Sequence, residues 1–177
     1  MGRTYRHVVP KFLFPRLEKE EIALNVYSPD CVPCWKEIPA LNLLHAEIES
    51  QFPSKALYMI VDPYQIVPDI TDDRPFGDVY KLAKTRMDIE VKNRKIQVPI
   101  VFMKPPFRVK EGGLITGTPE TLLFVTKPMR LYYNFLGSIS EQNVQWITFV
   151  KMQSSISFDT NLEWNHYESS IHQVYRL

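Results

Sequence analysis

The sequence lacks two features that would assign it to a membrane or to a nucleic acid. None of its apolar runs reaches the roughly 20 residues needed to cross a bilayer, and residues 1–21 lack the apolar stretch of a signal peptide. An excess of one charge is also missing, because 21 Lys and Arg residues are balanced by 20 Asp and Glu residues. We therefore expect no transmembrane segment and no nucleic acid partner. The cytoplasm and the extracytoplasmic space both stay open, since a chain whose leader had been removed would look the same.

Cysteine is scarce as well, because Cys31 and Cys34 are the only two in the sequence. A structural zinc ion needs four ligands, but a second Cys-x-x-Cys pair is absent and the four histidines follow no standard ligand spacing. The pair could form a static disulfide, although closing so short a loop restrains little of the unfolded chain. We expect no metal and no cofactor, but a redox-active disulfide between these two residues.

The hydrophobic fraction of 45% is enough for one core, and we expect a single domain over residues 1–177. Three short apolar runs predict buried strands: 22–27, 56–61 and 98–103. Two further runs have the spacing of an antiparallel hairpin: 121–125 and 130–135. Because helical segments alternate with the first strands, the pattern predicts an α/β fold with a parallel βαβ unit and a mixed central sheet.

The apolar spacing predicts two amphipathic helices between these strands: 34–50 and 76–93. Three glutamates are assigned to the polar face of the first helix: Glu37, Glu47 and Glu49. Residues 62–75, rich in Pro and Asp, predict a loop. Two more helices are expected further along the chain: about 138–153, and a last one from about residue 161.

The cysteine pair lies where a predicted strand ends and a predicted helix begins. Unpaired N–H groups and the dipole at a helix N-terminus favour thiolate over thiol, so we expect Cys31 to be the nucleophile and the more acidic and exposed thiol. Cys34, one helical turn later, can attack the resulting mixed disulfide and release the partner. Val32 and Pro33 carry no cation that would overstabilise the thiolate, so the couple is expected to be reducing.

Two separate motifs occur in this region. The first, Asn-Val-Tyr-Ser-Pro-Asp-Cys-Val-Pro-Cys-Trp-Lys-Glu-Ile-Pro, occupies residues 25–39, and the second, Gly-Thr-Pro-Glu-Thr, occupies residues 117–121. They resemble the Asn-Phe-Trp-Ala-x-Trp-Cys-x-Pro-Cys-x-x-Glu-x-Pro and Gly-x-Pro-Glu-Thr motifs of one branch of the thioredoxin superfamily, the TlpA, ResA and CcmG (DsbE) group of bacterial extracytoplasmic thioredoxins. The resemblance is strongest over residues 22–153.

This resemblance implies a thioredoxin fold in which the Thr118–Pro119 peptide bond is cis and faces the cysteines. The backbone of Thr118 would then pair with an extended partner segment. The resemblance also implies an extracytoplasmic or periplasmic reductase whose partners are protein disulfides or dithiols and a thiol electron donor. One alternative stays open, a thioredoxin-like protein-binding module whose redox activity has weakened.

Three residues near the pair affect this interpretation. Asp30 stands where the group usually has Trp, and its carboxylate beside Cys31 is expected to raise the pKa of the thiol. Asn25 stands where ordinary thioredoxins carry a buried acid, so proton transfer through that position is not expected. Trp35 is expected either beside the active site or in the core.

Two segments extend the simple thioredoxin pattern. The long separation between Cys31 and Pro119 predicts an insertion within residues 62–114, and such loops more often determine specificity than chemistry. The last predicted helix is an addition at the C-terminus, expected to cap the sheet.

Overall fold

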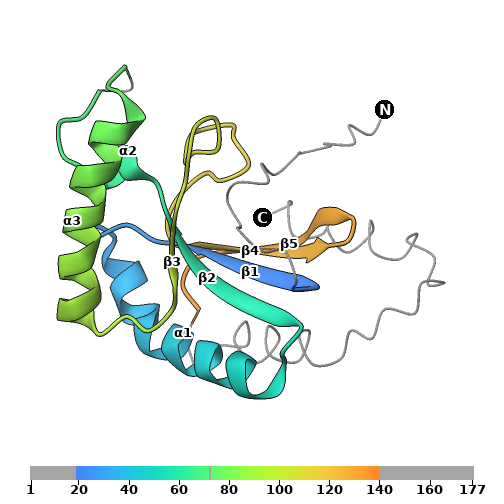
Figure 1. The fold of residues 1–177 in the computed structure, drawn as a ribbon. Helices are drawn as coiled ribbons and strands as arrows, with labels where there is room; N and C mark the ends of the chain where they lie inside the picture. The colour runs from blue at the N-terminus through green and yellow to red at the C-terminus, as the bar shows by residue number, and fades with distance from the viewer. Residues whose placement is uncertain (1–18, 72, 140–177) are drawn as a thin grey trace, which may run out of the picture.

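The computed structural model describes residues 19–71 and 73–139 of the chain. They form a five-stranded sheet with helices packed against it (Figure 1). The elements follow in chain order: β1 (Glu21–Val26), α1 (Val32–Gln51), β2 (Lys55–Val61), α2 (Pro63–Ile66), α3 (Phe76–Arg94), β3 (Ile100–Phe102), β4 (Glu120–Thr126) and β5 (Met129–Leu136). Within the two described segments, no helix is long and apolar enough to span a membrane.

The sheet is mixed, with the strand order β3-β2-β1-β4-β5. β1 and β3 are both parallel to β2, whereas β4 is antiparallel to its neighbours β1 and β5. The predicted α/β class, parallel βαβ unit and hairpin are therefore confirmed. Since Val26 pairs with Glu120, the chain leaving β1 and the chain entering β4 meet at one edge of the sheet.

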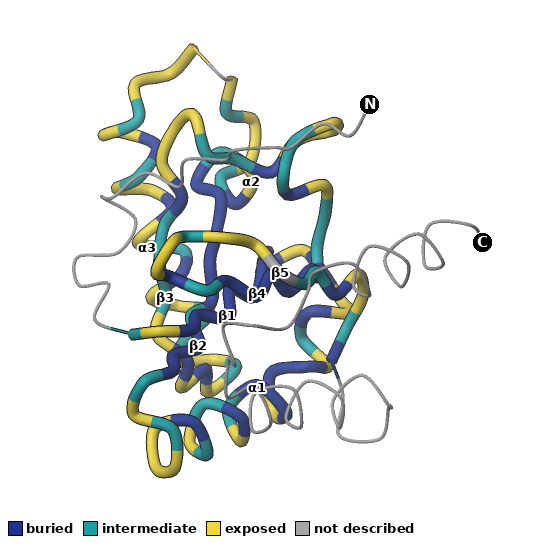
Figure 2. The backbone as a smooth tube through the Cα atoms, turned by 90° about the vertical axis from the view of Figure 1, so that its right-hand side faces the viewer, coloured by how far each residue is buried: buried dark blue, intermediate teal, exposed yellow. Residues whose placement is uncertain are grey.

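Alternation of side chains along the strands gives the sheet two apolar faces. One face packs against α1 and α3 and includes Ala23, Leu57 and Leu123. The other face includes Leu24 and Leu122 and is packed partly by the segment between β3 and β4. Figure 2 shows β1, β2 and β4 as largely buried, whereas β5 and the outward surfaces of the helices are largely exposed or intermediate. By the same alternation, Asn25 faces α1 together with Ala23.

The predicted loop at 62–75 is wrong in one detail, because α2 forms at its start. Asp62 causes this turn, since its side chain accepts a hydrogen bond from the backbone N of Tyr64 and so caps the helix. The predicted insertion region also contains α3, β3 and an isolated bridge between Val109 and Ile115. The helices predicted for 138–153 and from about 161 lie outside the described residues, apart from the first positions of the former.

Candidate active site

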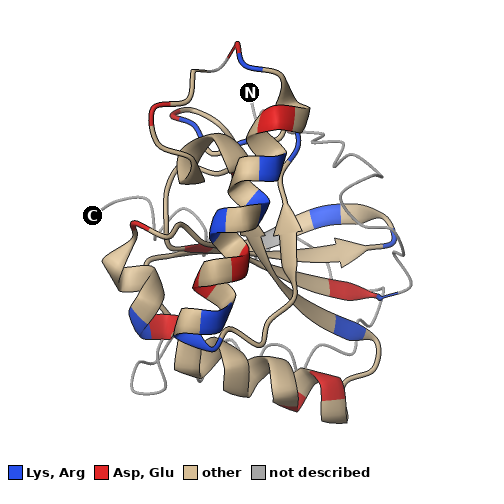
Figure 3. Ribbon diagram, turned by 60° about the vertical axis from the view of Figure 1, so that its left-hand side comes forward, with Lys and Arg blue, Asp and Glu red and all other residues tan. Residues whose placement is uncertain are grey.

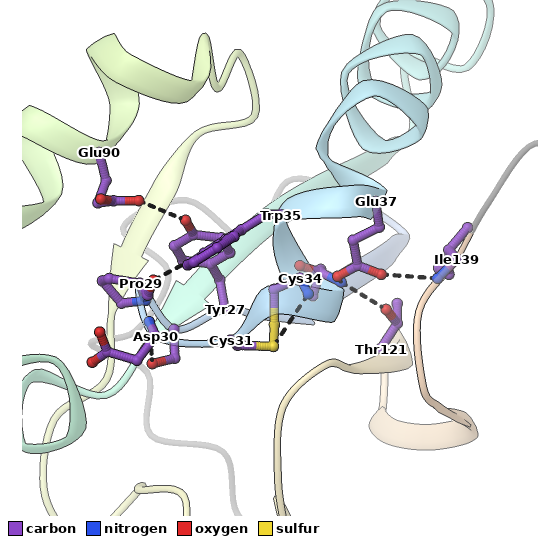
Figure 4. Close-up of a disulfide and its surroundings, with 12 residues drawn as sticks. Tyr27, Pro29, Asp30, Cys31, Cys34, Trp35, Glu37, Glu90, Thr121 and Ile139 are labelled. Atoms are coloured by element: carbon purple, nitrogen blue, oxygen red, sulfur yellow. Dashed lines mark hydrogen bonds between the residues drawn. A yellow bond between two sulfur atoms is a disulfide. The ribbon is translucent and has the colours of Figure 1, made fainter.

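Cys31 and Cys34 form a disulfide at the junction of β1 and α1. Cys31 is the N-cap of α1, and its Sγ accepts a hydrogen bond from the backbone N of Cys34 at 3.2 Å (Figure 4). Cys31 is 9% exposed and Cys34 is 0% exposed, so Cys31 is the more exposed thiol, as predicted. Part of Cys31 therefore lies at the surface, whereas Cys34 is fully enclosed.

The chain around the pair favours both the helix start and the thiolate. Pro33 lies in the first turn of α1, where its missing N–H costs nothing because no intrahelical acceptor exists for it there. No acidic residue lies in that first turn, so the positive end of the dipole is not offset from within the helix. Val32 is exposed beside the cysteines and leaves this end of the helix uncharged.

Trp35 and Tyr27 stabilise the turn that precedes Cys31. The indole Nε1 of Trp35 donates to the carbonyl oxygen of Pro29 at 2.9 Å, and the Arg94 guanidinium lies 3.9 Å from the Trp35 ring centroid. The hydroxyl of the buried Tyr27 donates to Glu90 at 2.9 Å. Burial is the main cause that raises the pKa of Tyr27, and the hydrogen bond to Glu90 raises it further. Trp35 is half-buried beside the active site, so it bounds the site and also packs against the core.

The Asp30 carboxylate is turned away from the Cys31 sulfur (Figure 4). It accepts a hydrogen bond from the Arg86 guanidinium on α3 at 2.7 Å. The sequence places this charge next to Cys31, but the structure places a cation against it. The carboxylate that was expected to act on the Cys31 thiol therefore pairs with Arg86 and points away from the sulfur.

Glu37 is buried between α1 and the sheet, which corrects its assignment to the polar face of the helix. Its Oε1 accepts from Nδ2 of Asn25 at 2.8 Å and its Oε2 accepts from the backbone N of Ile139 at 2.8 Å. Asn25 Nδ2 also donates to the hydroxyl of Thr121 at 3.0 Å. Burial raises the pKa of Glu37 from 4.5 to about 7, although the two hydrogen bonds act in the opposite direction.

Helical spacing could have located Glu37 in the core. It lies three residues after Cys34 and four before Leu41, both of which are buried on the inner face of α1. A charged glutamate is usually solvated, but the position of Glu37 on the inner face of α1 buries it. The buried acid next to this disulfide is therefore supplied by α1, whereas β1 supplies the amide of Asn25.

The second motif forms the loop that enters β4. The Thr118–Pro119 peptide bond is cis, as are the Pro105–Pro106 and Lys127–Pro128 bonds. The register of β1 and β4 places Pro119 beside the residue that follows Val26, at the edge where the cysteines lie. Within residues 19–71 and 73–139, no backbone hydrogen bond engages Thr118.

A buried carboxylate holds this loop. Oε2 of Glu120 accepts from the backbone N of Thr116 at 3.0 Å and of Gly117 at 3.3 Å. Oε1 of the same side chain accepts from Nδ2 of Asn134 on β5 at 2.6 Å. This residue has no expected role within the Gly-Thr-Pro-Glu-Thr motif, yet it fixes the backbone just before Thr118.

The segment between β3 and β4 is anchored at the same end of the sheet. Asp62, fully buried at the end of β2, accepts from Nε of Arg108 at 3.2 Å and from the backbone N of Val109 at 3.0 Å. The Arg108 guanidinium also lies 4.0 Å from the Tyr64 ring centroid. This segment is therefore held against the end of β2. No cluster of three or more His, Cys, Asp and Glu side chains suited to a metal occurs in the described part of the chain.

The strand order, the disulfide at the N-terminus of α1 and the loop before β4 define a thioredoxin fold. No protein-family model matches the sequence, and no curated protein does.

Several solved structures match this fold. A thiol:disulfide interchange protein of the thioredoxin family from Chlorobium tepidum TLS is 17% identical, with a TM-score of 0.52 over 77% of this chain and 81% of that one. The pneumococcal exposed lipoprotein thioredoxin Etrx1 from Streptococcus pneumoniae strain TIGR4 is 12% identical, with a TM-score of 0.52 over 78% and 86%. A DsbF homologue from Corynebacterium diphtheriae is 19% identical, with a TM-score of 0.50 over 76% and 73%. At these identities the likeness shows the fold.

Proposed function

We propose that this protein is a thiol–disulfide oxidoreductase that reduces protein disulfides, with Cys31 as the nucleophile and Cys34 as the resolving residue. The observation that supports this most is the position of the disulfide, at a helix N-terminus directly after the central strand, with Cys31 slightly exposed and Cys34 fully buried. The thiol:disulfide interchange named for the Chlorobium tepidum structure is the same chemistry. Fold alone does not determine function, so the proposal depends on the site.

The reaction takes place in two exchanges. The Cys31 thiolate attacks one sulfur of a substrate disulfide, so that a mixed disulfide forms while the other substrate sulfur leaves as a thiolate and takes up a proton. The Cys34 thiolate then attacks the Cys31 sulfur, which re-forms the Cys31–Cys34 bond and releases the second substrate thiolate. The substrate gains two electrons and two protons in total. A thiol donor reduces the protein disulfide again, and no other cofactor is required.

Glu37 is suited to the second exchange. Cys34 is fully buried, and burial disfavours the charged form of a thiol, so its proton needs an acceptor within the protein. Glu37 lies one helical turn further along α1 and has a pKa of about 7, so it is partly ionised near neutral pH. We assign it as the proton acceptor for Cys34. Asn25 holds the carboxyl in place and is itself held by the Thr121 hydroxyl, so neither is assigned a proton.

Thr118 is proposed as the contact for the substrate backbone. Its N–H and carbonyl are not engaged by other described backbone groups, and the loop that bears them is fixed by Glu120. An extended segment flanking the substrate disulfide would add to this edge as a short strand, which would align its sulfur with Cys31. Pro119, the next residue, is buried, and its carbonyl oxygen accepts from the backbone N of Gly137.

Two further properties are proposed for this protein, its reduction potential and its cellular location. Val32 and Pro33 bring no positive charge to the thiolate, so the reduction potential is proposed to lie nearer to roughly −270 mV than to −120 mV. The location is proposed to be extracytoplasmic, in line with the sequence motifs and with the exposed lipoprotein named for the Streptococcus pneumoniae structure.

Reduction of insulin disulfides tests the proposed function. The dithiol form of the wild type, supplied with dithiothreitol, should accelerate insulin reduction well above the rate with dithiothreitol alone, and Cys31→Ser should abolish the acceleration. Equilibration with glutathione buffers then gives the potential and the direction. If the wild type gives no acceleration at any pH from 6 to 8, the protein-binding module becomes the better interpretation.

A further inference from the structure

Three charged residues on one side of α3 contact residues on either side of Cys31. Arg86, Glu90 and Arg94 follow one another at intervals of four residues and therefore share a helix face. Glu90 accepts from Tyr27 at 2.9 Å, Arg94 stacks on Trp35, and Arg86 pairs with Asp30. Figure 3 shows that positive and negative residues gather along α3. Of the three contacts, the one at Asp30 lies nearest in sequence to the nucleophile.

Asp30 presents a problem for the proposed chemistry. A carboxylate adjacent to a cysteine opposes ionisation of the thiol and partly cancels the effect of the helix N-terminus. Asp30 is mostly exposed, so its side chain could rotate toward the sulfur unless something holds it. A nucleophile that must be a thiolate near neutral pH needs this charge to be compensated.

Arg86 provides that compensation from a fixed position. Nη2 donates to Oδ1 of Asp30 at 2.7 Å, while Nη1 donates to the backbone carbonyl of Ile66 at the end of α2. The Arg86 side chain is only 30% exposed, because it lies between α2 and the turn at Asp30. The second contact holds the guanidinium in place, so the Asp30 carboxylate is drawn toward α3 and away from Cys31.

We propose that Arg86 is a positioning residue for the thiol chemistry of Cys31, acting through Asp30. It holds the carboxylate away from the sulfur and offsets its charge, so that Cys31 remains nucleophilic despite an acidic neighbour. This inference rests on the proposed function, because it matters only if Cys31 reacts as a thiolate. It also explains how Asp can occupy the position before the first cysteine.

The other charged groups around the turn do not replace Arg86. Glu90 and Arg94 pair with each other at 2.6 Å on α3. Glu37 on α1 is buried on the inner side of the helix, next to Cys34. Arg108 in the segment before β4 pairs with the buried Asp62. Lys36 on α1 and Lys104 and Lys110 in that segment are exposed.

A double-mutant cycle tests the inference in a Cys34→Ser background, where Cys31 is the only thiol. The rate of alkylation by iodoacetamide, measured from pH 5 to 10, gives the pKa of Cys31. Arg86→Gln should raise this pKa by about 0.5 to 1 unit, which lowers the alkylation rate at neutral pH about three- to tenfold. Asp30→Asn should give a pKa at or below that of the parent, and the double variant should match Asp30→Asn. Arg86→Lys, which keeps the charge, should recover much of the loss.

The matched control is Lys84→Gln, which breaks the exposed pair with Asp88 on the same helix and should leave the pKa of Cys31 unchanged. An unchanged pKa in Arg86→Gln would overturn the inference. So would a rise that persists in the double variant, because the effect of Arg86 would then not act through Asp30. If Arg86→Gln does not fold, Asp30→Asn and Arg86→Lys decide the question, because a pKa of Cys31 above that of the parent in Asp30→Asn would overturn the inference. Failure of the wild type to reduce insulin would count against the proposed function but would leave the result of this cycle intact.

Discussion

Glu37 shows how burial changes what a residue can do. Its carboxyl is enclosed between α1 and the sheet, where Asn25 and the backbone of Ile139 donate to it. These donors favour the ionised form, but burial is the larger effect and raises the pKa to about 7. A carboxyl on the exposed face of α1, such as that of Glu49, experiences no such burial. The same side-chain type therefore titrates near neutrality at one position of this helix.

This raised pKa makes stability depend on pH in a defined direction. Below about pH 4.5, Glu37 is protonated in both the folded and the unfolded protein. Between that value and about 7, the unfolded protein loses the proton first, so the folded state loses stability as pH rises. The full loss is about 3 kcal/mol if the whole shift is realised. Glu37→Gln should lack this decline.

Urea unfolding of the oxidised proteins at pH 5 and pH 8 measures the difference. Wild type should lose more stability than Glu37→Gln between these two values, and Glu49→Gln, on the same helix, should behave as wild type. Equal pH dependence in wild type and Glu37→Gln would show that Glu37 does not titrate in this window.

Glu37→Gln should also slow release of the substrate, because Cys34 loses its proposed proton acceptor.

At the scale of elements, the loop before β4 depends on Glu120. This buried carboxylate joins the backbone of Thr116 and Gly117 to Asn134 on β5, so it fixes the loop to the sheet. Removing it takes away the acceptor of these part-buried or exposed donors, at a cost of about 0.5 to 1.5 kcal/mol for each lost hydrogen bond. Thr118, two residues before it, would then be less well placed for an extended substrate.

Glu120→Ala should therefore raise the KM for insulin several-fold while the alkylation rate of Cys31 by iodoacetamide stays the same. The small reagent needs only the sulfur, whereas the protein substrate also needs the loop. Glu111→Gln, an exposed change in the preceding segment, serves as the control for both measurements. An equal loss in both assays would show that Glu120 acts on the fold as a whole rather than on substrate docking.

At the scale of the whole molecule, the fold could be predicted from the sequence because its signals are local. The buried runs at 22–27 and 56–61 form adjacent parallel strands, and the two runs after Gly117 form the hairpin of β4 and β5. Their apolar periodicity depends only on neighbouring residues. The junction of β1 and α1 was predicted for the same reason, because the strand, the turn and the helix follow one another directly.

The contacts that tune the site were not predicted, because they join segments far apart in the chain. Arg86 meets Asp30 across 56 positions, and Arg108 meets Asp62 across 46. Nothing in the local pattern of either residue indicates its partner, since each lies in a segment with several other charged residues. Such pairings are determined only once α3 and the segment before β4 have packed against the sheet. Sequence motifs located the cysteines, and tertiary packing supplied their electrostatic environment.

The central claim is that Cys31 forms a covalent intermediate with a substrate and that Cys34 resolves it. Mixing reduced Cys34→Ser with insulin and quenching with acid should leave a mixed disulfide, which mass spectrometry of the intact protein and of its peptides should locate at Cys31. Wild type should accumulate almost none, because Cys34 releases the substrate, and Cys31→Ser should form none. An adduct at Cys34 in Cys31→Ser, or no adduct in Cys34→Ser, would contradict the mechanism.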